Sequence, residues 1–199
     1  MTTAFDIREA IARACAESAV HHDRLCPRQV LGVRMGLAGA HALGIEVPQR
    51  EPRLLVFAET DGCCLDGVSA ATGCTVGHRT LRVFDYGRVA ITTVDRETSR
   101  AVRIAPAPDV RERAWPYAPG EHRRYYAQLE GYQRMPAEQL LSVQPVTLNF
   151  DLNALIGRPG ARVDCTRCGE EVLNGRETLV DGQPVCPACR EPAYYSVTP

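Results

Sequence analysis

The chain has 199 residues, of which 45% are hydrophobic and 24% are charged, and its formal net charge is −1, a balance typical of a globular protein with one main domain. No apolar run reaches the roughly 18 residues that span a bilayer. The opening stretch MTTAFDIREAIARACAES lacks the apolar core of an export signal, so we expect a cytoplasmic protein with no membrane segment. The chain contains no lysine, and all 23 basic residues are arginines, which excludes Schiff-base, pyridoxal and P-loop lysines.

Two helices are predicted at the start of the chain. In residues 5–19, small and apolar side chains recur on one helical face, at Ile7, Ile11, Ala14, Cys15 and Ser18. Cys15 on this face is expected to be a buried small hydrophobe. A second helix is expected from Pro27, because proline suits the first helical turn.

Small residues form a strip along the second helix, where Gly32, Gly36 and Ala40 recur every four positions. A glycine inside a helix costs roughly 1 kcal/mol against alanine, so these glycines need a reason. We expect close packing against a sheet or another helix, which fixes Cys26 at the start of this helix.

The rest of the first 155 residues predicts an α+β domain, with helices packed on a mixed or antiparallel sheet. The expected elements are a buried strand at 53–60, a short helix at 65–73, a hairpin over 82–96 that turns near 85–87, a strand at 100–107, a helix at 120–134, a short helix from Pro136 and an extended segment at 141–150. Glycine and proline at 155–162 predict a linker, which divides the chain into a core at 1–155 and a module at 156–199.

The C-terminal module contains two Cys-x2-Cys pairs separated by seventeen residues, a spacing typical of a tetrahedral zinc site. The four cysteines are Cys165, Cys168, Cys186 and Cys189. We predict a zinc ribbon or treble clef that draws its folding energy from the metal, with a dithiol redox module as the alternative. Residues 160–199 carry four arginines against six acidic residues, the opposite of a basic nucleic-acid surface, so nucleic-acid binding is not expected.

A second group of metal-ligand residue types lies in the core, at His22, Cys26, Cys63, Cys64 and Cys74. They flank expected strand ends and helix starts, where a fold brings distant ligands together. One imidazole with two or three thiolates suits zinc or another borderline-soft metal. The plain alternative is a set of scattered buried cysteines.

Three motifs, in this order, resemble the FmdE family of formylmethanofuran dehydrogenase proteins: HDRLCPRQVLGVRMGLAGAHALG, CCLDGVSAATGCTVGHRTLRVFDYGRVAI and the terminal four-cysteine module. The resemblance covers about residues 15–105 and 165–189. It implies an α+β core that tends to dimerise, an auxiliary treble-clef zinc finger, and an association with molybdenum- or tungsten-dependent formylmethanofuran dehydrogenases. It does not imply activity on formylmethanofuran.

The resemblance also implies site residues. The His-x-His-x-Cys-Pro motif of the family matches His22 and Cys26, its Cys-x-x-Asp motif matches Cys63 and Asp66, and its Thr-Gly-Cys-Thr motif centres on Cys74. Cys64 is then an extra thiol, although the choice between Cys63 and Cys64 as ligand stays open.

Two positions depart from the family pattern. Arg24 replaces the second histidine, so a two-histidine ligand set requires His21. His78 stands where the family has a lysine, which alters the handling of an anionic ligand.

Two functions are open at this point. A metal-dependent enzyme, or an accessory protein to a molybdenum- or tungsten-type oxidoreductase, would use the core site. Its second metal, expected to be zinc, would be held by His22, Cys26, Cys63 and Cys74, with Cys63, Asp66 and His78 as catalytic candidates. Asp66 can equally cap a helix, and His78 can lie in a solvated turn.

The alternative is a non-catalytic interaction protein, in which both metals are structural and the terminal finger docks a partner such as an oxidoreductase subunit. A homodimer is expected as well. A zinc-finger regulator that binds DNA is disfavoured by the charge of the module. A closed site with four ligands favours a structural role, whereas three ligands and an open position favour catalysis.

Overall fold

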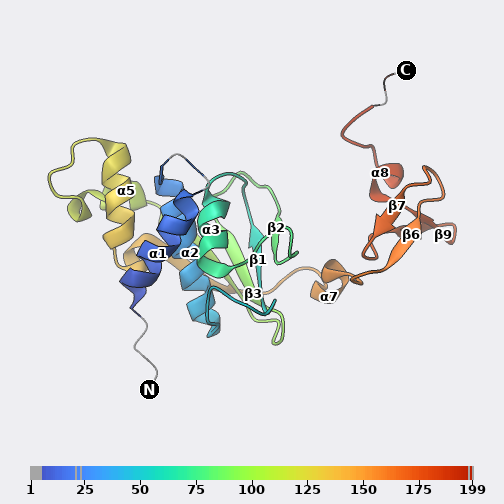
Figure 1. Cartoon of the computed structure of the whole chain (residues 1–199), viewed down its shortest axis with the longest axis horizontal. Helices are drawn as coiled ribbons and strands as arrows, with labels where there is room; N and C mark the ends of the chain where they lie inside the picture. Colours follow the sequence, from blue (N-terminus) through green and yellow to red (C-terminus); the bar gives the residue numbers. More distant parts are fainter. Residues whose placement is uncertain (1–5, 21, 23, 197, 199) are drawn as a thin grey trace. The chain divides into compact units, whose positions relative to one another are not determined.

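The computed structural model describes residues 6–20, 22, 24–196 and 198, and it divides the chain into two compact units, Met1–Thr147 and Leu148–Pro199 (Figure 1). The division falls before the expected 155/156 boundary, because helix α7 (Leu152–Ile156) belongs to the second unit. Among the described residues, no helix is both long enough and apolar enough to cross a membrane.

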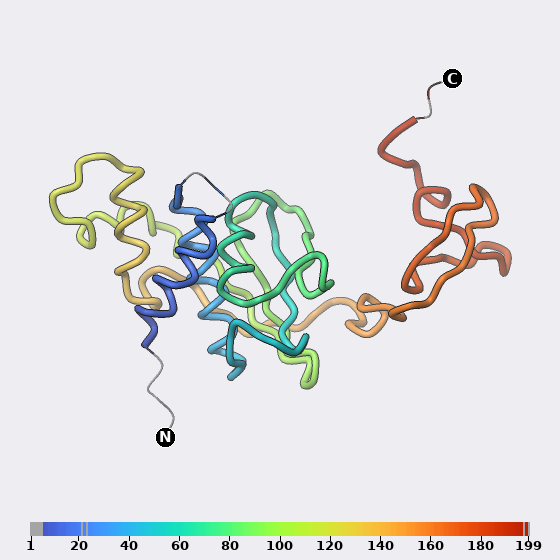
Figure 2. Tube along the Cα trace, viewed as in Figure 1, coloured from blue at the N-terminus to red at the C-terminus, as the bar shows by residue number. Residues whose placement is uncertain are grey.

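Helix α2 (Pro27–Leu43) is the centre of the first unit. It contacts α1 (Ile7–Ala19), α3 (Cys64–Thr72), α5 (Arg124–Arg134) and the sheet. Figure 1 and Figure 2 show α1, α2 and α3 side by side. Thirteen of the seventeen residues of α2 are buried, because neighbours cover it on almost every side.

Arg34 is the buried cation of α2, with an exposed fraction of 5%. Its guanidinium donates to the carbonyl oxygens of Tyr132 at 2.6 Å and Met135 at 2.8 Å. These carbonyls lie at the C-terminal end of α5, where helix carbonyls lack partners within the helix. Arg34 therefore fastens α5 to α2.

The sheet has five strands in the order β2-β1-β3-β4-β5. Their bounds are Leu54–Ala58 for β1, Leu81–Val83 for β2, Ile91–Asp95 for β3, Ala101–Pro106 for β4 and Leu141–Val146 for β5. β1 pairs with β2 in parallel, with Val56 opposite Leu81, and the other three pairs are antiparallel. The α+β class with a mixed sheet is therefore confirmed.

The hairpin expected over 82–96 is wrong. β2 and β3 lie on opposite sides of β1 and do not pair with each other. The segment between them turns around the end of β1, where the carbonyl oxygen of Ala58 accepts from Phe84 N–H at 2.8 Å. The carbonyl of Glu59 accepts from Tyr86 N–H at 2.9 Å. The residues between β2 and β3 therefore carry the chain past the end of β1 to its other side, and they do not form a hairpin turn.

The other expected elements occur with shifted ends. α3 ends at Thr72 and is capped by Gly73, whose φ of 73° is left-handed and favours glycine. The helix expected at 120–134 begins only at Arg124. Ile7, which was expected on the apolar face of the first helix, is exposed. Short helical turns, α4 (Val110–Arg113), η1 (Trp115–Tyr117) and α6 (Ala137–Leu140), complete the first unit.

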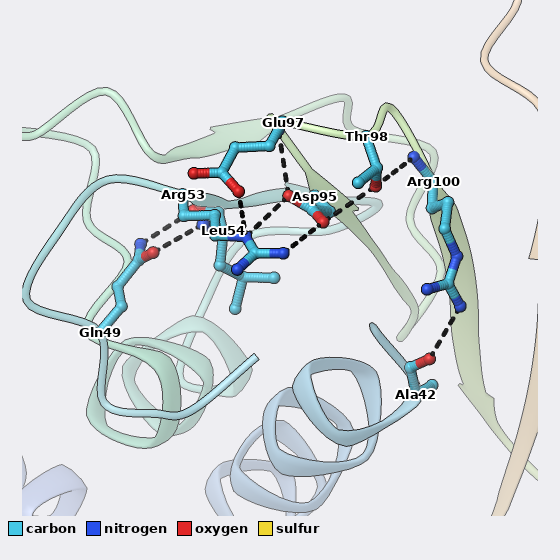
Figure 3. A network of polar contacts seen from close by, with 8 residues as sticks. All are labelled: Ala42, Gln49, Arg53, Leu54, Asp95, Glu97, Thr98 and Arg100. Carbon is cyan, nitrogen blue, oxygen red and sulfur yellow. Dashed lines mark hydrogen bonds and ion pairs between the residues drawn. The ribbon is translucent and has the colours of Figure 1, made fainter. Parts of the chain in front are cut away.

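A polar network closes one end of the sheet (Figure 3). Asp95 is 1% exposed and receives Arg53 through two hydrogen bonds of 3.0 and 2.9 Å. The same carboxylate accepts from Glu97 N–H and from the Thr98 hydroxyl in the turn after β3. The hydrogen bond from Arg53 is the main cause that holds the pKa of Asp95 far below its usual value.

The second unit contains α7, two β-hairpins and the short helix α8. The hairpins pair β6 (Arg162–Asp164) with β7 (Glu171–Leu173) and β8 (Thr178–Val180) with β9 (Gln183–Val185), and α8 covers Pro187–Arg190. Its buried cluster is small and contains Cys165, Val172 and Val185. So small an apolar core needs a metal or another cross-link for stability.

Candidate functional site

The terminal cysteines form a compact donor group. The sulfur atoms of Cys165, Cys168, Cys186 and Cys189 lie within 4.8 Å of one another, which fits a four-thiolate metal site. The backbone N–H of Cys186 donates to Cys165 Sγ at 3.2 Å and lowers the pKa of the Cys165 thiol to about 6. Contacts with Cys186 and Cys168 raise the pKa of Cys189 to about 12, so its thiol is hard to deprotonate without a cation. A metal ion bound by the four sulfur atoms would favour the thiolate.

In the core, glycines bring α2 and α3 into contact through their backbones. A Cβ atom on Gly32 would lie 2.0 Å from the carbonyl oxygen of Cys64. A Cβ atom on Gly67 would lie 2.1 Å from the carbonyl oxygen of Gln29. Gly32 and Gly67 therefore each lie against the backbone of the other helix, and the N-terminal ends of α2 and α3 lie together.

Two cysteines cap these adjacent helix ends. Cys26 is the N-cap of α2, Cys63 is the N-cap of α3, and their Sγ atoms are 3.2 Å apart. Burial first, and the neighbouring Cys26 second, raise the pKa of the Cys63 thiol to about 11. The two thiols are partly exposed and meet from segments 37 positions apart in sequence.

Gln29 fixes the position of Cys26. Its side-chain oxygen accepts from Cys26 N–H at 2.8 Å, and its own N–H donates to Cys26 Sγ at 3.4 Å, which completes a capping box. The side-chain nitrogen of Gln29, Nε2, donates to the backbone carbonyl of Ser18 in α1 at 2.8 Å and to the Ser18 hydroxyl at 2.9 Å. Gln29 was not among the residues predicted from the sequence, although a glutamine three residues after an N-cap is the signature of this box.

His22 and Asp66 form a second pair at the same helix ends. Their Nε2 and Oδ2 atoms are 2.7 Å apart, and each side chain is more than a third exposed. Asp66 lies in the first turn of α3, three positions after Cys63. Since Asp66 contacts Nε2, a metal ion held by His22 would be bound through the other ring nitrogen, Nδ1.

Cys74 lies at the opposite end of α3. It is fully buried, accepts from the Gln49 amide at 3.1 Å and donates to the Leu54 carbonyl at 3.3 Å. The nine residues of α3 span about 13 Å at 1.5 Å per residue, so Cys74 is not brought to the Cys26–Cys63 pair.

Two further candidates do not join the pair. Cys64 is 2% exposed, and burial raises the pKa of its thiol to about 12, whereas Cys63 is the thiol that lies 3.2 Å from Cys26. His78 lies exposed in the turn after Cys74, with its Nδ1 atom 3.0 Å from the Thr75 hydroxyl. His21 lies outside the described residues.

A pocket of about 330 Å³ lies along α3, and Asp66 is one of the residues that line it. Its lining residues are Glu17, Asp66, Ser69, Ala70, Gly73 and Thr75. Asp66 therefore touches His22 and also faces a space that is large enough for a small ligand.

The core group is looser than the terminal one. Across the part of the chain that the structure describes, only the four terminal cysteines place three or more histidine, cysteine or acidic ligand atoms within 4.8 Å of one another. A core metal would therefore draw His22 closer to the two thiols.

Comparisons with known proteins agree with this fold. The family described as "FmdE, Molybdenum formylmethanofuran dehydrogenase operon" matches residues 21–143, more than half of the chain. A probable S-adenosyl-L-methionine-binding protein of Archaeoglobus fulgidus is 34% identical over 97 residues, which cover 47% of this chain and 26% of that protein. The match thus spans about a quarter of the relative's length.

A solved structure is similar over almost its whole length. It is a tungsten formylmethanofuran dehydrogenase FmdE-like protein from Syntrophus aciditrophicus, with a TM-score of 0.59 and 18% sequence identity. The alignment covers 94% of this chain and 95% of that chain. At this identity the likeness concerns the fold.

Proposed function

The chain belongs to the FmdE family, and from that premise we propose that it is a two-site metalloprotein with a structural zinc and a reactive core metal. The four terminal cysteines hold the zinc. His22, Cys26 and Cys63 hold the core metal, which is also zinc, and one coordination position stays open to a ligand.

The observation that carries the proposal is the meeting of Cys26 and Cys63 at 3.2 Å, together with the contact of His22 to Asp66 in the first turn of α3. Two thiolates bound to a tetrahedral zinc at about 2.3 Å lie about 3.8 Å apart, so a small side-chain rotation accommodates the ion. Metal-bound histidines commonly donate their second ring N–H to a carboxylate, which is what the His22–Asp66 contact supplies. The donor set fits zinc.

Three protein ligands favour catalysis over a purely structural role, because Cys74 lies at the other end of α3 and does not close the site. A metal held there supplies Lewis-acid polarisation of a ligand atom. Asp66 orients His22 and lines the adjacent pocket, where its carboxylate is placed to accept a proton from a bound molecule. The substrate would enter through this pocket.

Metal analysis of the full chain tests the two-site proposal. We expect two zinc ions per chain, and one after Cys26→Ser or Cys63→Ser. Cys74→Ser is the matched control, because a serine hydroxyl keeps the bonds to Gln49 and Leu54, and it should retain both ions. One ion in the wild type, lost on Cys168→Ser, would leave only the terminal site.

Cobalt substitution tests the open position. In the Cys168→Ser variant, only the core site should bind cobalt, and an added small thiol should change the visible spectrum if a position is free. A spectrum that does not respond would favour the non-catalytic interaction role. Family membership also favours a homodimer and an oxidoreductase partner, which light scattering and co-purification from the native host would test.

A further inference from the structure

We propose that Cys26 and Cys63 form a reversible intramolecular disulfide, so that the core site is also a thiol–disulfide exchange site. The disulfide itself does not depend on a metal. Its consequence for metal binding rests on the function proposed above, because sulfurs in a disulfide no longer act as thiolate ligands.

The first support is distance. The two Sγ atoms are 3.2 Å apart, and a disulfide bond of about 2.05 Å requires them to approach by only about 1.2 Å. Each cysteine precedes the first residue of a helix, and the contacts at Gly32 and Gly67 hold the two helix ends together. The pair is therefore held close before any oxidant arrives.

The second support is selective access. The first unit contains five cysteines, and three of them, Cys15, Cys64 and Cys74, are at most 3% exposed. Only Cys26 and Cys63 are partly open to solvent. Since thiol–disulfide exchange requires access to the sulfur, a small oxidant selects this pair among the core thiols.

The exchange is balanced with a low-molecular-weight disulfide, R–S–S–R, as the oxidant. One thiol of the pair attacks it, releases one R–SH and leaves a mixed disulfide. The other thiol then attacks the protein sulfur of that mixed disulfide and releases the second R–SH. One S–S bond breaks and one forms, the protein pair is oxidised, and both protons leave with the released thiols.

The test uses the full chain exposed to oxidised glutathione, followed by alkylation of free thiols, trypsin and mass spectrometry. Cleavage at arginine places Cys26 in a peptide of residues 25–28 and Cys63 in a peptide of residues 54–79. We expect these peptides to be linked, and separated again by a reductant. Cys26→Ser and Cys63→Ser should abolish the link, and Cys74→Ser should keep it.

Two results would overturn the disulfide. One is alkylation of both thiols, or separate glutathione adducts on each, without a linked peptide. The other is a link that persists in Cys63→Ser, because it would then involve a different cysteine of the 54–79 peptide.

Zinc release, measured in the same samples, separates this proposal from the previous one. Release of the core zinc in step with the link supports both. A link without zinc release from a two-zinc protein would overturn the core metal site and leave the disulfide standing. A zinc-loaded core that forms no link after the zinc is removed by a chelator would overturn only the disulfide.

Discussion

Gly32 of α2 and Gly67 of α3 are reciprocal contacts: each would place a Cβ atom about 2 Å from a carbonyl oxygen of the other helix. At such a distance neither position accepts a side chain without moving a helix. The contact explains why α2 retains a glycine where alanine would favour helix formation by roughly 1 kcal/mol. It also places the N-caps Cys26 and Cys63 side by side.

Replacing Gly67 by alanine should therefore destabilise the protein and disturb the thiol pair. The methyl group overlaps the Gln29 carbonyl, and overpacking of this kind costs about 1–3 kcal/mol or more, which outweighs the gain in helix propensity. Urea unfolding should show a free energy of unfolding lower by about 2 kcal/mol. Gly77→Ala, with only the Thr75 hydroxyl within 4.0 Å of the added Cβ, is the control and should be close to neutral. Equal stability of the two variants would contradict the role of the contact.

Gln29 should be essential to the position of Cys26, although it binds no ligand itself. Gln29→Ala leaves Cys26 N–H and two acceptors of Ser18 without their partner at a fully buried position. Each buried polar group that loses its partner costs about 1–3 kcal/mol, so we expect the free energy of unfolding to fall by about 3 kcal/mol. Alkylation of Cys26 should become faster as its cap loosens. Gln133→Ala is the control, because it removes one hydrogen bond to the Leu129 carbonyl at a half-buried site. It should lower the free energy of unfolding by less than about 1 kcal/mol.

The Arg53–Asp95 pair should make stability depend on acid pH. Because the pKa of Asp95 is lowered in the folded chain, its stabilisation is complete above the unfolded value of about 3.9 and is lost as the pH falls toward the folded value. Asp95→Asn should cost about 2–3 kcal/mol at pH 7, since a buried charged hydrogen-bond partner is removed. The gap between wild type and variant should narrow as unfolding is measured from pH 5 down to about pH 2.

Asp109→Asn is the matched control for that measurement. Asp109 pairs with Arg113 on the surface of α4, with both side chains about half exposed, and such pairs contribute about 0–1 kcal/mol. A gap for Asp95→Asn that stays constant with pH would show that its carboxylate is not held ionised by Arg53.

Local patterns in the sequence were sufficient for most elements of the first unit. These elements could be predicted because their signals come from residues close together in the chain: the apolar periodicity of α1, the proline at the start of α2 and the apolar run of β1. The hairpin prediction failed because strand pairing is not local. β1, α3 and β2 form a strand–helix–strand unit, and such a crossover places its two strands in parallel. The second side of β1 was then free for β3.

The candidate site was predictable in composition more than in geometry. Residue types and the family resemblance pointed to Cys26, Cys63 and Asp66, but the motif that contains Cys74 follows the other end of α3. A helix of nine residues separates the two. The sequence predicts this helix at 65–73, but the ligand set that joined Cys63 and Cys74 did not take its length of about 13 Å into account. The capping role of Gln29 has a local sequence signal, but its contact with Ser18 has none, because Ser18 belongs to a different helix.

Asp66 should control the affinity of the core metal without being one of its ligands. Asp66→Asn keeps the shape of the side chain but removes the charge that fixes the His22 ring through its Nε2 atom. Loss of such an outer partner typically lowers metal affinity about 10- to 100-fold. We expect this decrease in a competition titration with a chromophoric chelator, and no change at the four-cysteine site of the same protein.

Glu17→Gln is the control for charge in this region, because Glu17 lines the same pocket as Asp66 and is not the residue paired with His22. It should change the affinity of the core site for the metal by no more than about twofold, because an exposed charge that does not contact a ligand is largely screened. An Asp66→Asn protein that binds as tightly as wild type would remove His22 from the ligand set. The core donors would then be the thiols of Cys26 and Cys63 alone, a pair better suited to disulfide exchange than to holding a metal.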